Sequence, residues 1–238
     1  MKHVPRVFVP ARLAPGPLTI EGEPSRHLNT VLRVRPGDPL LLFSGDGREW
    51  RATVSAATKQ GTLVVVGEIA RMEAPSPLVL ELWAAPVRAN RFDWLVEKCA
   101  EAGADVIRPV ITEFTQSPDA SSGKVERWRR VVIEAGEQCG RLFVPIVEPP
   151  TPLARAAEGF HGTFVYGDPD GPPALEAARL IPTSGHVALV IGPAGGLSDA
   201  DTALLTSRGA IGMKFGPHLL RTETAALAGV ALIRALAG

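Results

Sequence analysis

The sequence predicts an α/β protein of two domains, in which a small β-barrel precedes a larger domain with a parallel sheet. Short apolar runs separated by turn signals fill the first 72 residues, and apolar runs alternate with helical patterns from residue 79 onward. The proline-bearing stretch Glu73-Ala74-Pro75-Ser76-Pro77 lies between them. With 238 residues, 45% of them hydrophobic, the chain can bury a core in each part. We therefore expect domains at residues 1–72 and 78–238, joined by a linker at 73–77.

The first domain carries the pattern of a small barrel. Its expected strands are the apolar runs at residues 7–9, 40–43, 52–54 and 63–69. Pro-Gly, Gly-Asp-Gly and Lys-Gln-Gly sequences between these runs are turn signals. One short helix is expected at residues 26–32, with Ser25 as its N-cap.

Strands and helices alternate through the second domain. Expected strands occupy residues 79–84, 106–111, 162–166 and 187–191, and expected helices occupy residues 91–102, 125–138 and 173–180. Gly103 is placed to end the first of these helices. The continuous apolar runs are typical of parallel strands that are buried on both faces. This order of elements predicts a parallel sheet covered by helices.

Two glycine-bearing turns follow apolar runs near the end of the chain. The first, Ile191-Gly192-Pro193-Ala194-Gly195-Gly196-Leu197, ends the strand at 187–191 and precedes Ser198, an expected helix N-cap. The second begins at Gly216-Pro217, after a possible short strand at 212–215, and opens the expected helix at 222–237. Glycine lets a ligand approach bare backbone, and open α/β sheets bind ligands at the carboxyl ends of their strands. The two turns together therefore predict a pocket.

The spacing of the first turn excludes two common phosphate-binding loops. No Gly-Lys-Ser/Thr follows it, and it lacks the Gly-x-Gly-x-x-Gly spacing of a dinucleotide fold. A glycine turn of this kind is structural about as often as it binds a ligand, so its residues alone do not identify a ligand. The helix at 222–237 is apolar on nearly every face apart from Arg234, which indicates burial in its own core or against a partner.

The two turns resemble the paired signature of the bacterial 16S ribosomal RNA (uracil-N3)-methyltransferase family, within the SPOUT superfamily of knotted methyltransferases. The second half of that signature is the run Leu220-Arg221-Thr222-Glu223-Thr224-Ala225, which is highly specific. Further segments in the family's order stand at residues 6–9, 27–38, 98–104 and 134–141. The sequence departs from the family's usual pattern at Ala194, where Glu is usual, and at His218, where Arg is usual. If that Glu were a catalytic base, this chain would lack it, so a structural or loop-ordering role is expected at the position of Ala194. The charge at His218 would depend on pH.

The resemblance implies a PUA-like barrel and a SPOUT-type parallel α/β domain with a C-terminal deep trefoil knot, formed by the chain from about residue 185. It also implies that S-adenosylmethionine binds where three bends meet. The expected cofactor-binding residues are Tyr166, Gly167, Ile191, Gly192, Gly195, Gly196, Leu197, Phe215, Leu219, Leu220, Thr222, Thr224 and Ala225. For Leu219 and Leu220, ordinary core packing is an equally good interpretation, since pocket walls are also mostly apolar.

Methylation of uracil N3 requires alignment of the two reactants and removal of the N3 proton. Arg221 is the first candidate to stabilise negative charge on the uracil oxygens, and Glu223 is a candidate proton acceptor. A structural ion pair for Arg221 and a helix-start acid for Glu223 are the alternatives. Arg141, at the end of an expected helix, could approach RNA or a partner's pocket, or be a helix C-terminal charge.

Charge is distributed unevenly although the net charge is zero. Residues 1–60 hold nine Lys and Arg against five Asp and Glu, an excess of four that the remainder offsets. We therefore expect the first domain to face RNA, or else to carry a solvated face of mixed charge. The candidate RNA-binding residues are Arg6, Arg26, His27, Arg33 and Arg35. So small an excess implies weak, salt-sensitive binding, which favours a folded substrate such as the small ribosomal subunit.

The remaining sequence features agree with a cytoplasmic enzyme. Cys99 and Cys139 lack metal-ligand or C-x-x-C spacing and are expected to be reduced thiols, and no metal is expected. No run approaches the length of a membrane span, and the N-terminus lacks a signal-peptide apolar region. A homodimer through the last helix is expected. Two rival functions remain: a non-catalytic RNA-binding module and a knotted methyltransferase acting on transfer RNA.

Overall fold

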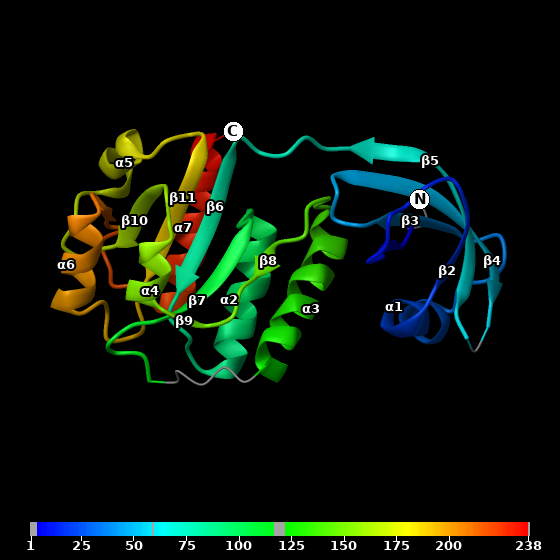
Figure 1. Cartoon of the computed structure of the whole chain (residues 1–238), viewed down its shortest axis with the longest axis horizontal. Helices are drawn as coiled ribbons and strands as arrows, with labels where there is room; N and C mark the ends of the chain where they lie inside the picture. Colours follow the sequence, from blue (N-terminus) through cyan, green and yellow to red (C-terminus); the bar gives the residue numbers. More distant parts are fainter. Residues whose placement is uncertain (1–3, 59, 117–121, 238) are drawn as a thin grey trace. The chain divides into compact units, whose positions relative to one another are not determined.

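The computed structural model describes residues 4–58, 60–116 and 122–237, and it divides into two compact units (Figure 1). The first unit is the chain up to Pro75 together with Gly136–Val144. The second unit begins with Ser76–Ala135 and resumes at Pro145. The segment at 136–144 therefore leaves the α/β part of the sequence to pack with the first unit.

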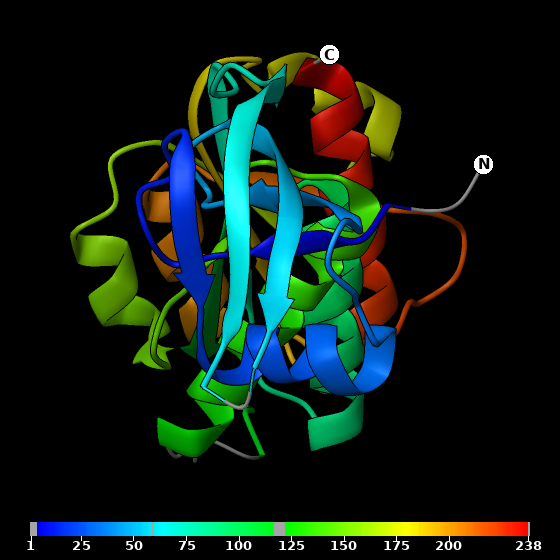
Figure 2. The same ribbon diagram turned by 90° about the vertical axis from the view of Figure 1, so that its right-hand side faces the viewer.

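Five strands form the sheet of the first unit. They are β1 (Arg6–Phe8), β2 (Gly16–Ile20), β3 (Pro39–Phe43), β4 (Arg48–Ala57) and β5 (Thr62–Met72). Their order is β1-β3-β4-β5-β2, and all neighbours are antiparallel except β1 and β3. Figure 2 looks onto this unit, with β5 in cyan between β2 and β4. The strand β2 was not expected from the sequence. It contains Pro17, which an edge strand tolerates because one side of its backbone pairs with no neighbouring strand.

The expected helix of this unit begins earlier than predicted. Helix α1 (Gly22–Arg26) runs directly into the π-helix η1 (His27–Leu32). The assignment of Ser25 as an N-cap was wrong, because Ser25 lies inside α1 and its buried hydroxyl shares a 2.8 Å hydrogen bond with that of Thr62. Asn29 joins this contact by accepting a hydrogen bond from the Thr62 hydroxyl at 3.0 Å. The helical segment is thus held to the start of β5, at one end of the sheet.

The second unit contains a parallel sheet, as the sequence predicts. Its strands are β6 (Leu78–Ala84), β7 (Val106–Ile111), β8 (Ile146–Val147), β9 (Thr151–Pro152), β10 (Thr163–Gly167), β11 (Gly185–Ile191) and β12 (Ile211–Met213). The order is β12-β10-β11-β6-β7-β8, with β9 paired to β7, and every pair of neighbours is parallel. The carboxyl ends of β10, β11 and β12 therefore lie next to one another.

Helices cover this sheet. They are α2 (Ala89–Ala102), α3 (Ser122–Cys139), α4 (Leu153–Glu158), α5 (Ala174–Ala177) with the 3₁₀ turn η2 (Ala178–Leu180), α6 (Asp199–Ser207) and α7 (Thr222–Ala237). Gly103 ends α2 in a left-handed conformation, as expected. The prediction that Ser198 caps a helix is also confirmed: it forms a capping box with Asp201 at the start of α6.

Helix packing and an aromatic core surround the central strands of the sheet. Helix α7 packs against α2, β6 and β11, and so it begins close to the carboxyl end of β11. On β6 and β10, the ring centroids of Trp83 and Phe164 lie 5.4 Å apart, and the core around them includes Phe160.

In the described part of the chain, none of the helices is both long enough and apolar enough to cross a membrane.

A candidate cofactor pocket at the carboxyl edge of the sheet

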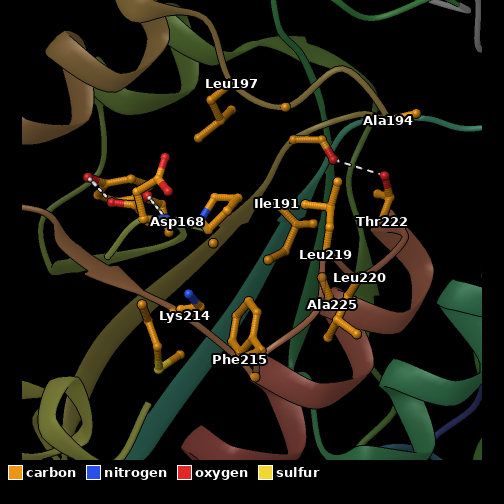
Figure 3. A pocket seen from close by; sticks show the side chains of 18 of the residues that line it. Asp168, Ile191, Ala194, Leu197, Lys214, Phe215, Leu219, Leu220, Thr222 and Ala225 are labelled. Carbon is orange, nitrogen blue, oxygen red and sulfur yellow. Dashed lines mark hydrogen bonds between the residues drawn. The ribbon is translucent and has the colours of Figure 1, made fainter. Parts of the chain in front are cut away.

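A pocket of about 520 Å³ opens where β10, β11 and β12 end. Its walls come from the three loops that follow these strands and from the first turn of α7 (Figure 3). The volume lies within the range of small-molecule sites, and the location agrees with the ligand sites of open α/β sheets. All of the lining residues belong to the second unit.

The glycine loop after β11 forms one wall. A Cβ atom on Gly192 would lie 2.8 Å from the carbonyl carbon of Gly196, so this tight fold excludes any other residue at Gly192 without rearrangement. Gly196 has a positive φ of 81°, and a Cβ there would meet no atom within 4 Å. The loop therefore presents bare backbone to the pocket, which permits the close approach that its sequence indicates.

The first turn of α7 forms the facing wall. The Thr222 hydroxyl donates a 3.0 Å hydrogen bond to the carbonyl oxygen of Gly192, which ties the helix start to the glycine loop. Ala225 lies three residues further along the same helix face and also lines the pocket. Thr224 was expected at the cofactor but lies outside this pocket, because helical periodicity turns it to another face.

The third wall carries the pocket's carboxylates. Asp168 follows β10, and its backbone N–H donates to the carbonyl oxygen of Met213 at 3.0 Å, which joins the ends of β10 and β12. The Tyr166 hydroxyl donates to an Asp168 carboxylate oxygen at 3.4 Å. Burial and the negative charge of Asp168 together raise the pKa of Tyr166. Tyr166 therefore remains a neutral hydrogen-bond donor at neutral pH.

The rest of the lining is mainly apolar. Figure 3 shows Ile191, Leu197, Phe215 and Leu220 around the cavity, with Asp168 and Thr222 on opposite sides of it in this view. Leu219 is 79% exposed although it lines the pocket, so ordinary core packing does not account for it. A cavity whose walls combine apolar side chains with polar side chains and bare backbone suits a flat ring system joined to a polar chain.

Twelve of the thirteen residues expected at the cofactor line this pocket, and Thr224 is the exception. Several other lining residues were not expected from the sequence: Asp168, Pro169, Asp170, Thr202, Met213 and Lys214. Asp168 directly follows the expected residues Tyr166 and Gly167 and could have been found from that position. The others reach the pocket through strand order, which the sequence does not reveal.

The three catalytic candidates have different surroundings. The Arg221 side chain is exposed just before α7, and its carbonyl oxygen accepts the 2.8 Å hydrogen bond of Ala225 that begins the helix. Glu223 is half-buried and forms a 3.4 Å ion pair with Arg91. Arg141 lies beyond the end of α3, where its Nε donates to the carbonyl oxygen of Phe143 at 3.2 Å. Arg141 belongs to the first unit, whereas Arg221 and Glu223 belong to the second.

Four of the five candidate RNA-binding residues are exposed on the first unit: Arg26, His27, Arg33 and Arg35. Arg6 is different, because its side chain is only 11% exposed and pairs with Glu49 at 2.6 Å. Its guanidinium also donates to the carbonyl oxygens of Gly136, Glu137 and Arg141. The expectation that Arg6 contacts RNA is therefore wrong, since its donors hold the segment at 136–144 within the first unit.

The described residues contain no group of three or more His, Cys, Asp or Glu side chains that could hold a metal ion. Cys99 and Cys139 are free thiols, the first buried and the second exposed. Burial raises the pKa of Cys99 to about 12. Cys99 is therefore an inert part of the core at neutral pH.

Comparison with known proteins places the chain in a family. Residues 74–234 match the family model described as RNA methyltransferase domain, and residues 20–66 match RNA methyltransferase PUA domain. The ribosomal RNA small subunit methyltransferase E of Mycobacterium bovis is 31% identical over 222 residues, which cover 87% of this chain and 82% of that protein. The Synechocystis protein of the same name is 29% identical over 242 residues, covering 97% and 77%.

Solved structures resemble the whole chain. The ribosomal RNA small subunit methyltransferase E of Neisseria gonorrhoeae, solved bound to S-adenosyl methionine, has a TM-score of 0.90 with 29% identity and covers 98% of both chains. A Legionella pneumophila protein described as a methyltransferase, solved in complex with the cofactor SAM, has a TM-score of 0.88 with 30% identity and the same coverage. The chain therefore belongs to the RNA methyltransferase family of the ribosomal RNA small subunit methyltransferases E, in which a PUA domain precedes the methyltransferase domain.

Proposed function

We propose that this chain methylates N3 of a uridine in 16S ribosomal RNA, within the small ribosomal subunit, and that it takes the methyl group from S-adenosylmethionine. The pocket between the glycine loop and the start of α7 is the observation that carries this proposal. Family membership supports the reaction class, and the names of the relatives support the ribosomal substrate. Such a substrate implies a cytoplasmic site of action.

The lining residues fit this cofactor. Ile191, Leu197 and Leu220 provide apolar contact for an adenine ring, and the bare backbone at Gly195 and Gly196 can approach it. The Asp168 carboxylate offers negative charge to a ligand that carries a sulfonium and an ammonium group. When bound, the cofactor supplies an electrophilic methyl group for in-line displacement.

The chain's own residues have three tasks in the reaction. Thr222 fixes the start of α7 against the glycine loop and so sets the position of Arg221 relative to the pocket. The exposed guanidinium of Arg221 stabilises negative charge on the uracil oxygens as the N3 proton leaves. Glu223 is the candidate acceptor of that proton, and its ion pair with Arg91 holds its carboxylate in place.

The first unit supplies electrostatic attraction to RNA. Arg26, His27, Arg33 and Arg35 are exposed on or beside the π-helix. These groups can contact phosphates without reading sequence, so affinity should depend on salt. Arg141, in the same unit, remains a candidate contact with RNA or with a partner's pocket, as the sequence suggests.

We propose two further structural features, one of assembly and one of chain topology. The first is a homodimer formed through the outward face of α7, where Thr224, Ala231 and Ala235 are exposed and uncharged. The second is the deep trefoil knot of the SPOUT superfamily at the C-terminal end. Pulling the chain by its ends in optical tweezers tests the knot, because a knotted chain extends to less than its full contour length.

A substrate panel tests the proposed function. The protein is incubated with S-adenosylmethionine labelled in its methyl group and with unmodified small ribosomal subunits, free 16S RNA or transfer RNA. We expect label in the small subunits and little in free 16S RNA or transfer RNA. Preferential labelling of transfer RNA would favour the rival methyltransferase function, and cofactor binding without transfer to any RNA would contradict the proposal.

A further inference from the structure

Two apolar side chains are exposed on the π-helix of the first unit. Leu28, Val31 and Leu32 have the i, i+3, i+4 spacing of an apolar stripe, which on a helix normally packs into the core. Leu28 does pack there and is fully buried, whereas Val31 is 65% exposed and Leu32 is 41% exposed. The core of this unit therefore takes one residue of the stripe and leaves an apolar pair, Val31 and Leu32, at the surface.

The backbone turns sharply just after the apolar pair. Among the residues that the structure describes, Arg33 is the one residue other than glycine with a positive φ, at 52°. The backbone N–H groups of Arg33 and Val34 both donate to the carbonyl oxygen of Leu28, and Val34 returns to the core. A left-handed backbone is uncommon at a residue other than glycine, and π-helical turns are frequent at functional sites. This local geometry points to a function for the residues that it exposes.

Polar contacts fix the inner side of the same helical segment to the sheet. Besides accepting from Thr62, the Asn29 side chain donates to the carbonyl oxygen of Thr58 at 3.3 Å. Ser25 shares its buried hydrogen bond with the same Thr62. Figure 2 shows the segment in blue below the strands of this unit in that view. The apolar pair is therefore presented on a segment that is anchored to β5.

Arginines flank the apolar pair in the chain. Arg26 comes directly before the π-helix, and Arg33 and Arg35 follow it, all three of them exposed. Residues 26–37 contain no Asp or Glu. Asp38 comes next, and its carboxylate accepts the backbone N–H of Arg35 at 2.7 Å. The apolar pair thus lies within a basic stretch of the surface, which suits a polyanionic partner.

RNA with an interrupted base stack fits both kinds of group. Arginines suit phosphates, but the sugar-phosphate backbone offers little apolar surface to Val31 and Leu32. The faces of the bases do offer it, and proteins reach them in loops and bulges, where bases are unstacked. Several nucleic-acid-binding proteins insert apolar side chains between bases in this way.

We propose that Val31 and Leu32 form an apolar wedge that enters an interrupted base stack of the RNA, at a bulge or a loop. The flanking arginines contact the phosphates on either side of that step. This inference rests on the proposed function, which supplies RNA as the partner. The wedge gives the first unit an affinity that does not depend on salt and a preference for the shape of the RNA, neither of which its small charge excess can provide.

Binding to two labelled RNA hairpins tests the wedge without any need for catalysis. One hairpin has a continuous stem, and the other has the same stem interrupted by a bulge. Fluorescence anisotropy is measured with the full-length protein and with the double variant Val31→Ser/Leu32→Ser. We expect the unchanged protein to prefer the bulged hairpin. The double variant should bind that hairpin roughly tenfold more weakly, because two aliphatic side chains are no longer buried against bases.

The control is the double variant Leu63→Ser/Val65→Ser. Leu63 and Val65 are exposed aliphatic residues of β5 in the same unit, at 40% and 49%. They alternate with Thr62, which contacts the helical segment, so they lie on the opposite face of the sheet. This variant should bind both hairpins as the unchanged protein does.

The salt dependence of binding separates the wedge from the charges around it. Each phosphate contact contributes roughly −0.7 to −0.9 to the slope of log K against log salt concentration. Val31→Ser/Leu32→Ser should lower the affinity by the same factor at every salt concentration and leave this slope unchanged. Arg33→Gln should instead make the slope shallower by about one phosphate contact. A 2-aminopurine placed beside the bulge should brighten when the unchanged protein binds and not when the double variant does.

Equal affinity of Val31→Ser/Leu32→Ser and the unchanged protein for the bulged hairpin would overturn the inference. Equal affinity of the unchanged protein for the two hairpins, or a shallower salt slope in the double variant, would also overturn it. A different mass of the double variant in light scattering would assign the apolar pair to a protein interface instead. Should the double variant not fold, the single variants Val31→Ser and Leu32→Ser and the 2-aminopurine signal of the unchanged protein decide the question.

The substrate panel separates this inference from the proposed function. If the unchanged protein methylates no RNA but its preference for the bulged hairpin depends on Val31 and Leu32, the proposed function fails and the wedge stands. If the unchanged protein methylates small subunits and the double variant binds and methylates RNA equally well, the wedge fails and the proposed function stands.

Discussion

Two glycines with the same backbone constraint have different surroundings. Gly196 and Gly209 have φ values of 81° and 72°, and at neither position would a Cβ meet an atom within 4 Å. Only Gly196 lines the cofactor pocket. A side chain at either position would strain the backbone by roughly 1–3 kcal/mol. A comparison of the two positions therefore separates the effect of the pocket from the effect of strain.

Replacement of Gly196 by Val should weaken binding of S-adenosylmethionine by roughly tenfold or more, because the new side chain occupies the space where bare backbone meets the ligand. Gly209→Val should lower the melting temperature to a similar extent and leave cofactor affinity unchanged. Isothermal titration calorimetry on both variants checks this. Equal cofactor affinity in Gly196→Val and the unchanged protein would remove the glycine loop from the site.

We propose that Arg221 acts in the methyl transfer rather than in binding of the cofactor. Arg221→Ala should lower turnover roughly a hundredfold, the scale seen when one positioned electrostatic donor is lost. Arg221→Lys should restore only part of the rate, because Lys lacks the planar guanidinium. Cofactor affinity should stay the same in both variants.

Single-turnover kinetics on small ribosomal subunits measures the Arg221 effect. Arg179→Ala is the control, since Arg179 is also an exposed arginine of the second unit and does not line the cofactor pocket. Full turnover in Arg221→Ala together with a lower melting temperature would show that Arg221 is structural.

The two thiols should differ in reactivity. Burial raises the pKa of Cys99 to about 12, so at pH 8 this thiol is protonated and shielded, whereas Cys139 is exposed. We expect a disulfide reagent such as dithionitrobenzoate to modify one thiol per native chain at pH 8 and two after denaturation. Modification of two thiols in the native protein would contradict the burial of Cys99.

The glycine loop and the turn at Leu220 to Ala225 could be recognised in the sequence, because their composition is unusual and their residues are local. Arg6 shows the limit of this approach. Its partners stand 43 and more than 100 residues away, so the sequence offers a basic residue but not the buried ion pair with Glu49. Thr224 shows a second limit: the bounds of α7 were predicted correctly, but the sequence does not show which face of the helix turns toward the pocket.

Long elements with a clear periodicity were predicted well from the sequence. The strands β6, β7 and β11 and the helices α2 and α7 stand within two residues of their expected bounds. The strands β8 and β9 were missed, because two residues are too few to produce a pattern. The π-helix at His27–Leu32 was also missed, since no sequence rule distinguishes its wider turn from an α-helix.

Helix α7 carries the prediction about assembly. Ala231 is exposed in the middle of this helix, so a charged side chain there should separate a dimer that packs through α7. Light scattering should give about twice the 25.2 kDa chain mass for the unchanged protein and the mass of one chain for Ala231→Arg. Ala203→Arg, at an exposed alanine of α6, is the control and should remain dimeric. A monomer in the unchanged protein at micromolar concentration would contradict the prediction.

At the scale of the whole molecule, the sequence identifies an N-terminal β-rich part and an α/β part. It does not reveal that one segment from the α/β part of the sequence packs with the first unit. The segment Gly136–Val144 joins the first unit through hydrogen bonds from Arg6 and through the backbone N–H of Phe8, which donates to Glu137 at 2.8 Å. Such contacts depend on tertiary folding and leave no local signal. The sequence likewise gives no local signal that the carboxyl ends of β10, β11 and β12 lie together and form the candidate cofactor pocket.

The position of the transferred methyl group distinguishes methylation of uridine N3 from every other modification of the RNA. Small ribosomal subunits are methylated by the protein with labelled S-adenosylmethionine, the 16S RNA is digested to nucleosides, and the labelled nucleoside is identified by mass spectrometry against standards. We expect 3-methyluridine from one site in 16S RNA, and roughly hundredfold slower formation of it when Arg221→Ala replaces the unchanged protein. Label in a ribose 2′-O-methyl nucleoside, in another methylated base, or in no nucleoside of the 16S RNA would contradict it.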